Sequence, residues 1–405
     1  MNQTLNRKTD SDRSTLPILA GGIIALAVAM GIGRFAFTPM LPLMLRDGII
    51  DIATGTEWAA ANYIGYLIGA LSASRFGKNT RRGIMLGLAG IGITTLGIVF
   101  AGASVTWLGT ILRGASGIFS AWVLVCTSGW CLNALAAKQA SGQGSWLYTG
   151  VGLGITVTGV LTWLGGQQSA ATLWIELGAL ACAGAMLAMV CMKDRAPVAS
   201  APAQHTIATS VSEGRQGSAA LVICYGTFGF GYIIPATFLP TMARQLTSDP
   251  QIFGLTWPIF GFAAAVSVAL VSRWMSGWKR IHVWALAQGC MALGTLLPLF
   301  VNALWAIAVS AVLVGGTFMV ATMAGLQLAR ERMPADPTRL LGRMTAGFAA
   351  GQIIGPLVVR AIGPGEIAGW DAFGWANAIA TVLLAVTAVW LWRMERSQPL
   401  SAARR

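Results

Sequence analysis

The chain has 405 residues, of which 55% are hydrophobic and only 10% are charged. A soluble protein normally carries about a quarter charged residues, so the composition excludes a protein whose main solvent is water. The formal net charge of +13 would suit a nucleic-acid-binding protein, but the basic residues punctuate the gaps between apolar segments and form no basic face, which excludes that class.

About 20 apolar residues in a helix span the hydrocarbon core of a bilayer. Twelve such segments predict an all-α polytopic membrane protein. They cover 16–45, 54–76, 83–101, 104–133, 142–166 and 171–192 in the first half, and 218–245, 251–275, 282–301, 303–332, 342–363 and 372–393 in the second. We therefore expect an N-terminal six-helix bundle over 1–192, a polar linker over 193–217 and a C-terminal six-helix bundle over 218–405.

The second half repeats the first at a constant offset of about 198 residues. The residues that recur are Gly31, Gly33, Leu41, Pro42, Met44 and Arg46, as Gly229, Gly231, Leu239, Pro240, Met242 and Arg244. Ser74-Arg75-Phe76 returns as Ser272-Arg273-Trp274, and Gly117 as Gly315. Two homologous halves in so apolar a chain indicate a membrane transporter whose pathway lies between the repeats.

Lysine and arginine set the expected orientation. With twelve spans both termini lie on one side, and that side carries twenty-two basic residues, whereas the loops of the other side carry only Arg46 and Arg244. Loops rich in lysine and arginine stay in the cytoplasm. The distribution therefore predicts a cytoplasmic position for both termini and for the linker.

Several motifs resemble the major facilitator superfamily. The segment from Ala70 to Arg82 is similar to the loop motif between spans 2 and 3 of that family, at Arg75, Gly77, Lys78, Arg81 and Arg82, with Ser74 in place of the family's aspartate. Span 4 carries Arg113 and Gly117, similar to the R-x-x-x-G signature. In span 5, Gly150, Gly154 and Gly159 partly match the antiporter signature, with Ile155 in place of its proline.

The run from Gly31 to Met44 resembles span 1 of the YbfB/YjiJ-type subgroup of this superfamily. The resemblance implies a secondary transporter of the bacterial inner membrane that works by alternating access. It also implies that Arg75, Gly77, Lys78, Arg81 and Arg82 form a conformational motif, and that Arg113 acts in proton coupling or binds a substrate carboxylate.

Arg34 is the strongest candidate for a substrate contact. It lies near the middle of span 1, where an arginine costs roughly 2.5–3.5 kcal/mol on insertion scales. It could face the central cavity and attract an anionic group, or it could snorkel or bind backbone carbonyls. Its repeat counterpart is Tyr232, so the two halves differ at this position. For Arg113, the alternative to a functional role is a structural pair within the N-terminal half.

Glu176 is the only carboxylate well inside a predicted span and is the candidate proton-coupling partner of Arg113. A plain interfacial role is the alternative. Tyr63 and Tyr66 share one face of span 2, and Gln352 lies in span 11, so these residues and Tyr232 are candidates to line the pathway. Each could equally make a helix–helix hydrogen bond. Arg360, near the outer end of span 11, is interpreted as snorkelling.

No phosphate-binding loop, hydrolytic triad or metal-ligand cluster is present, so we expect neither an enzyme nor a cofactor or metal. Our hypothesis is a secondary active transporter for a small solute, coupled to protons, with a preference for efflux and for an anionic or carboxylate-bearing substrate. The excess of buried cations over deep carboxylates favours the anion. We expect a monomer in the lipid bilayer. The alternatives are an uncoupled facilitator and a membrane ligand sensor without transport.

Overall fold

The structure is a computed structural model that describes residues 15–76, 79–102, 104–192, 214–275, 277–333 and 337–396. Gly77, Lys78 and most of the predicted linker lie outside these residues. Eleven helices in the described part of the chain are long and apolar enough to cross a membrane. The fold is helical, in agreement with the expected all-α class, and the described residues contain one isolated β-bridge, between Ile367 and Trp370.

The N-terminal group of helices begins with a long span over Thr15–Arg46. This span contains a π-helix, η1, and then α2. The elements of the group are η1 (Ala27–Arg34), α2 (Phe37–Arg46), α3 (Ile52–Ser72), η2 (Ala73–Phe76), α4 (Thr80–Gly97), η3 (Ile98–Phe100), α5 (Thr106–Ala137), η4 (Ser141–Tyr148), α6 (Thr149–Leu164) and α7 (Ala170–Cys191).

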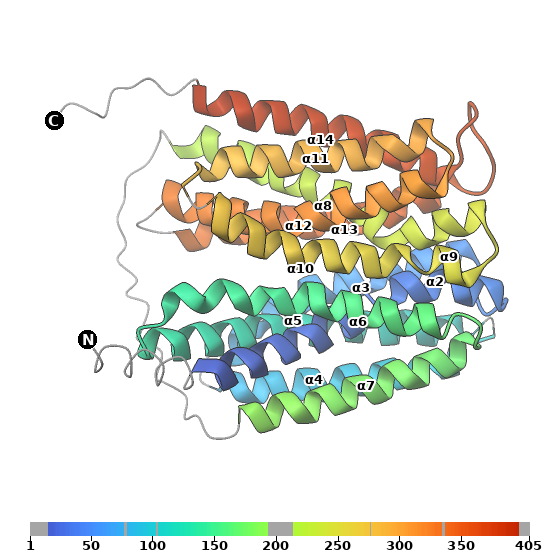
Figure 1. The fold of residues 1–405 in the computed structure, drawn as a ribbon, viewed down its shortest axis with the longest axis horizontal. Coiled ribbons are helices and arrows are strands. Elements are labelled where there is room, and N and C mark those ends of the chain that lie inside the picture. The colour runs from blue at the N-terminus through green and yellow to red at the C-terminus, as the bar shows by residue number, and fades with distance from the viewer. Residues whose placement is uncertain are drawn as a thin grey trace.

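The C-terminal group consists of α8 (Gly214–Leu246), α9 (Pro250–Phe253), α10 (Thr256–Trp274), α11 (Arg280–Phe300), α12 (Leu304–Arg332), α13 (Pro337–Ile362) and α14 (Ala372–Arg396). Helix α8 begins at Gly214, inside the segment that we expected to be linker. Figure 1 shows the two groups side by side, with their helices nearly parallel to one axis. The predicted division into two six-helix bundles agrees with this arrangement, while the residues at which each bundle begins and ends stay a prediction.

The main contacts between the two groups are those of α3 with α13, α6 with α10 and α2 with α8. Buried apolar side chains from both groups form one continuous cluster. Large apolar residues such as Leu71, Ile93 and Phe100 are exposed on the outside. An apolar exterior around a packed interior is the pattern expected where the helices face lipid.

Helix α3 is the expected span that falls outside the eleven. It is a regular helix of 21 residues, but Glu57, Asn62, Tyr63 and Tyr66 lower its hydropathy. Asn62 and Tyr63 are buried, and α3 lies between α5 of its own group and α13 of the other. Polar residues of this span therefore find partners inside the protein, on α5 and on the other group, and the twelve predicted spans are all present as helices.

Glycines allow α3 and α5 to approach closely. Substitution of one of them by alanine tests this packing. A Cβ added at Gly117 would lie 2.1 Å from the backbone oxygen of Asn62, whereas one added at Gly114 would lie 3.6 Å from that of Ala61. Because the backbone of α3 cannot move aside cheaply, we expect Gly117→Ala to lower stability by about 1–3 kcal/mol. Thermal unfolding in detergent measures the effect. Gly114→Ala is the matched control on the same helix, and equal losses in both variants would contradict the packing described here.

Candidate functional site

The first span is interrupted at Arg34. The π-helix η1 ends at this residue, and α2 begins at Phe37 after a two-residue turn. The amide of Thr38 donates to the carbonyl oxygen of Phe35, at 3.1 Å, and Pro39 has no N–H to offer. The carbonyl of Arg34 is therefore left without its usual helical donors. Short π-helical segments of this kind are frequent at functional sites.

Side chains from α3 and α5 satisfy the carbonyl groups at the interruption. The guanidinium of Arg113 donates from Nη1 to the oxygen of Gly33, at 3.2 Å, and from Nη2 to the oxygen of Arg34, at 3.0 Å. Ser116 Oγ also donates to the oxygen of Gly33, at 2.7 Å. Asn62 Nδ2 donates to the backbone oxygen of Arg113, at 2.9 Å. Arg113 thus holds the end of the π-helix in place through two backbone carbonyls.

The guanidinium of Arg34 lies between the two groups of helices, and the residue as a whole is 3% exposed. Its carbon Cζ lies 3.8 Å from the ring centroid of Tyr66 and 5.6 Å from that of Tyr63. Nη2 donates to Oε1 of Gln352 on α13, at 2.7 Å, while Nε has no hydrogen-bond partner among the described residues. No carboxylate in the described part of the chain forms an ion pair with Arg34. The arginine is therefore a buried cation that rests on ring faces and a neutral amide.

The residue opposite Arg34 is its repeat counterpart, Tyr232. Gln352 Nε2 donates to the Tyr232 hydroxyl, so a chain of hydrogen bonds runs from Arg34 through Gln352 to Tyr232. The Tyr232 ring is stacked between those of Phe318 and Phe348, with ring centroids 5.5 Å apart on each side. The N-terminal group thus contributes a cation at this level, and the C-terminal group contributes an aromatic surface.

Further contacts join the two groups beside this chain of hydrogen bonds. Thr38 Oγ1 donates to the backbone oxygen of Ala236, its own repeat counterpart, at 2.6 Å. The hydroxyl groups of Tyr63 and Thr237 lie 2.8 Å apart, and both side chains are buried. The predicted site residues Arg34, Tyr63, Tyr66, Tyr232 and Gln352 are therefore brought together between the groups, with Arg113 directly behind Arg34.

The ends of the two groups are also joined near α9. Glu57 of α3 forms an ion pair with Arg360 of α13, at 3.2 Å, and accepts a hydrogen bond from Thr110 Oγ1. Trp163 Nε1 donates to the backbone oxygen of Gln251, at 2.8 Å. The structure corrects the interpretation of Arg360: it is half-exposed, but it is paired across the interface instead of merely reaching for the membrane surface. We call this end of the molecule, where α9 lies, the α9 end.

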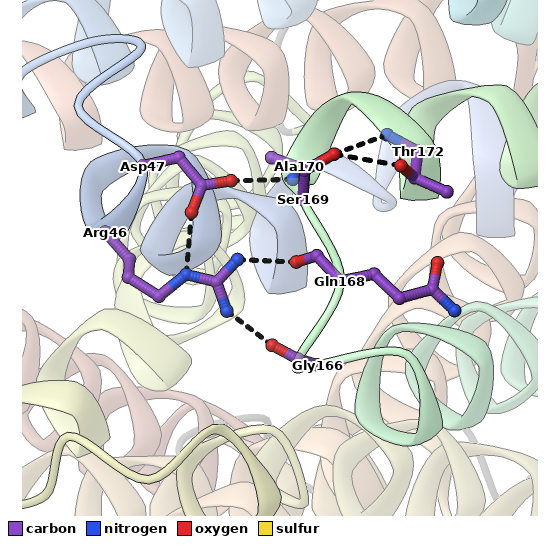
Figure 2. A network of polar contacts seen from close by, with 7 residues as sticks. All are labelled: Arg46, Asp47, Gly166, Gln168, Ser169, Ala170 and Thr172. Carbon is purple, nitrogen blue, oxygen red and sulfur yellow. Dashed lines mark hydrogen bonds and ion pairs between the residues drawn. The ribbon is translucent and has the colours of Figure 1, made fainter.

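A separate polar network stiffens the N-terminal group at the α9 end (Figure 2). Arg46 Nη1 and Nη2 donate to the backbone oxygens of Gly166 and Gln168, and Nε donates to Asp47 at 2.7 Å. The second oxygen of Asp47 accepts from the Ala170 amide, at 2.7 Å, at the beginning of α7. Partial burial favours the neutral carboxyl, but the bonds from Arg46 and Ala170 outweigh it and hold the pKa of Asp47 below its usual value.

A pH measurement tests this network. A lowered pKa means that Asp47 adds stability above the unfolded-state value of 3.8, and that the contribution is lost as pH falls through the lower folded-state pKa. We expect Asp47→Asn to cost about 1 kcal/mol at neutral pH, because the pair is partly solvated. The stability of the variant and that of the wild type should converge in strong acid. A constant difference from neutral to strongly acidic pH would contradict this role.

The remaining predicted residues lie away from the Arg34 site. Glu176 is half-buried on α7 and has no hydrogen bond or ion pair with described residues. Arg75, Arg81 and Arg82 are exposed where α3 meets α4. No cluster of three or more His, Cys, Asp or Glu side chains that could hold a metal occurs in the described ranges. The proton-coupling and conformational roles of these residues stay predictions.

Sequence reasoning missed several contacts of the site. Thr38, Ser116 and Thr237 are small hydroxyl residues that look like ordinary span residues, and Phe318 and Phe348 look like core. One usable signal was present for Thr38: it stands 198 residues before Ala236, which it contacts. Equivalent positions of a two-fold repeat can meet at the pseudo-symmetry axis. The repeat therefore pointed to this pair.

Solved structures share the fold of the chain. The nucleoside transporter NupG has a TM-score of 0.72 at 13% identity, with 94% of this chain and 100% of that chain covered. The POT family transporter PepTSo has a TM-score of 0.72 at 10% identity, with coverage of 95% and 98%. A D-xylose-proton symporter has a TM-score of 0.71 at 14% identity, with coverage of 94% and 96%. At such identities these likenesses establish the fold alone.

Sequence comparisons identify the family. The class D tetracycline resistance protein of Salmonella ordonez is 24% identical over 143 residues, which is 35% of this chain and only 36% of that protein. The family model described as "Uncharacterised MFS-type transporter YbfB" matches residues 26–392, nearly the whole chain. The chain is therefore a multi-pass membrane transporter, not an enzyme, and it belongs to the YbfB-type family of the major facilitator superfamily.

Proposed function

We propose that this protein is a proton-coupled secondary transporter of the bacterial cytoplasmic membrane that moves a small anionic or carboxylate-bearing solute by alternating access. The observation that carries the proposal is Arg34, a buried cation between the two groups of helices that has no carboxylate partner among the described residues. A charge in this position is expensive and is retained where it serves transport. An anionic solute would supply the missing negative charge.

The orientation and direction are part of the same proposal. Both termini face the cytoplasm, as the basic loops indicate, so the α9 end faces outward. The protein works as a monomer and favours efflux. The partial antiporter pattern in α6 and the partial match to a tetracycline resistance protein support this direction. The Glu57–Arg360 ion pair and the Trp163–Gln251 bond would close the outer side in this state and separate when the pathway opens outward.

Within the proposal, the solute binds at a site formed by Arg34, Tyr63, Tyr66, Tyr232 and Gln352. Arg113 either binds the solute or takes part in proton coupling, and Glu176 takes up and releases the coupled proton. The exposed Arg75, Arg81 and Arg82, with Gly77 and Lys78, act in the conformational change. The substrate roles are supported by the cluster around Arg34.

An uncoupled facilitator is the second candidate, and one observation favours it. Glu57 and Glu176, the carboxylates within the spans of the N-terminal group, form no hydrogen bond or ion pair with Arg34 or Arg113. A proton-coupled cycle needs a group that takes up and releases a proton, and neither of these two carboxylates is placed beside either arginine. The facilitator would move the same anionic solutes down their own gradient.

Proteoliposomes with an imposed pH gradient separate the candidates. A panel of radiolabelled organic anions, with neutral sugars and nucleosides as controls, is presented with and without the gradient. Flux of an anion that follows the pH gradient supports the transporter, and flux that ignores it supports the facilitator. Binding without flux would indicate a ligand sensor. Transport restricted to the neutral solutes would overturn the anionic assignment.

A further inference from the structure

The charge available at the site is that of a single cation. Arg113 is a second cation, but both of its Nη groups donate to backbone oxygens of η1, and no hydrogen bond joins it to a described residue of the C-terminal group. Tyr66 covers one face of the Arg34 guanidinium, which leaves its edge to bind a partner. That edge is held by Gln352 Oε1, a neutral acceptor. A carboxylate is the stronger partner for a guanidinium edge, because both groups are charged and can pair in a bidentate manner.

The surroundings of this edge are aromatic. The Phe318, Tyr232 and Phe348 rings form a stack with interplanar angles of 5° and 7°. Phe318 and Tyr232 are buried, whereas Phe348, whose ring also contacts those of Tyr225 and Phe228, is partly exposed. Tyr66 is also partly exposed, and the helices α3 and α13 that carry Tyr66 and Phe348 pack on each other. The two partly exposed aromatic residues therefore lie on neighbouring helices: Tyr66 on α3 stacks on Arg34, and Phe348 lies on α13, which also carries Gln352.

We infer that the substrate is a planar aromatic monocarboxylate, and that its carboxylate displaces Gln352 from Arg34 while its ring packs against Tyr66 and Phe348. This inference rests on the proposed function, whose site it specifies. One cation matches one negative charge, because a second charge would be buried without a partner. Flat aromatic faces favour a flat ligand over a puckered one of equal charge.

Displacement of Gln352 has a mechanical result. The Arg34–Gln352 bond joins the two groups of helices, and a carboxylate bound to Arg34 replaces it by a bond to the ligand. Gln352 keeps its partner Tyr232 within the C-terminal group. Binding therefore removes one of the bonds between the groups, at the place where they must separate for the pathway to open towards the α9 end.

The first test needs only the wild-type protein. Equilibrium dialysis of the purified full-length chain in detergent measures the binding of radiolabelled 1-naphthoate. Competition then compares cyclohexanecarboxylate, which has the charge without the flat ring, with 1-naphthalenemethanol, which has the ring without the charge, and with the dianion phthalate. We expect 1-naphthoate to bind at least about tenfold more tightly than each competitor. Equal affinity for the two monocarboxylates, or tighter binding of the alcohol, would overturn the inference.

Variants test the competition directly. Gln352→Ala removes the side chain that competes with the ligand carboxylate for Arg34, so it should tighten 1-naphthoate binding. Gln352→Glu places a carboxylate beside Arg34, so it should abolish 1-naphthoate binding. Gln288 is a buried glutamine of the same group whose amide bonds to Thr387, so Gln288→Ala is the matched control and should leave the affinity unchanged. Phe348→Leu should reduce the preference for 1-naphthoate over cyclohexanecarboxylate. Weaker binding in Gln352→Ala, with Gln288→Ala unaffected, would contradict the displacement.

The outcomes for substrate and for transport can be told apart. If proteoliposomes carry other organic anions but none of the aromatic carboxylates competes, the substrate inference fails and the proposed function stands. If 1-naphthoate binds in the predicted order but no solute crosses the membrane, the proposed function fails and the site stands.

Discussion

Arg34→Ala is expected to weaken the binding of anionic solutes strongly while the protein remains inserted and folded. Hydrogen bonds to charged groups contribute about 1.5–3 kcal/mol each, so affinity should fall by about 10- to 150-fold. The fold should survive for a specific reason: Arg113 bonds to the backbone oxygen of Arg34, which alanine retains. Removal of a buried charge that has no ion-pair partner among the described residues also relieves a desolvation cost.

The measurement compares two ligand-binding curves and one stability curve. Any carboxylate that stabilises the wild-type protein in a thermal-shift screen is titrated into Arg34→Ala by equilibrium dialysis. Arg34→Lys is a second useful variant, because it keeps the positive charge but loses the planar guanidinium that can pair with a carboxylate through two hydrogen bonds. Arg343→Ala is the matched control, since this arginine is exposed on α13 and has no role in the proposed site. Wild-type affinity in Arg34→Ala would remove Arg34 from the site.

Arg113→Leu should lose binding and stability together. The carbonyl oxygen of Arg34 would lose the donor that replaces its missing helical partner, while that of Gly33 would retain Ser116. An orphaned buried carbonyl costs about 1–3 kcal/mol. Because Arg113 holds the end of η1, its loss should also move the guanidinium of Arg34 away from Gln352. Arg113 would then act as a positioning residue for Arg34.

Two readouts separate this positioning role from the proton coupling that the family resemblance implies. If Arg113 only couples protons, the variant should bind its solute normally and carry it without regard to the pH gradient. If Arg113 positions Arg34, solute affinity should fall at every pH. Ser116→Ala gives the graded comparison: Gly33 keeps its bond from Arg113, so the loss of affinity should be smaller. Unchanged solute affinity in Arg113→Leu would show that Arg113 does not position Arg34.

The apolar segments predicted the number of helices, and the repeat identified Tyr232 as the counterpart of Arg34. They could not predict which carbonyls at the end of η1 lack donors, since this depends on Thr38 turning its amide to Phe35. The hydrogen bonds from Arg113 could therefore not be predicted from the sequence. The Glu57–Arg360 pair was missed for another reason: its members are 303 residues apart, and no local pattern links them.

The lower apolarity of α3 has a consequence for biosynthesis. A helix that carries Glu57, Asn62, Tyr63 and Tyr66 partitions weakly into lipid on its own. Its polar groups find partners on α5 and on the C-terminal group, which emerge later from the ribosome. During synthesis α3 should therefore remain near the translocon until α5 arrives, and the first three spans alone should form a poorly inserted fragment.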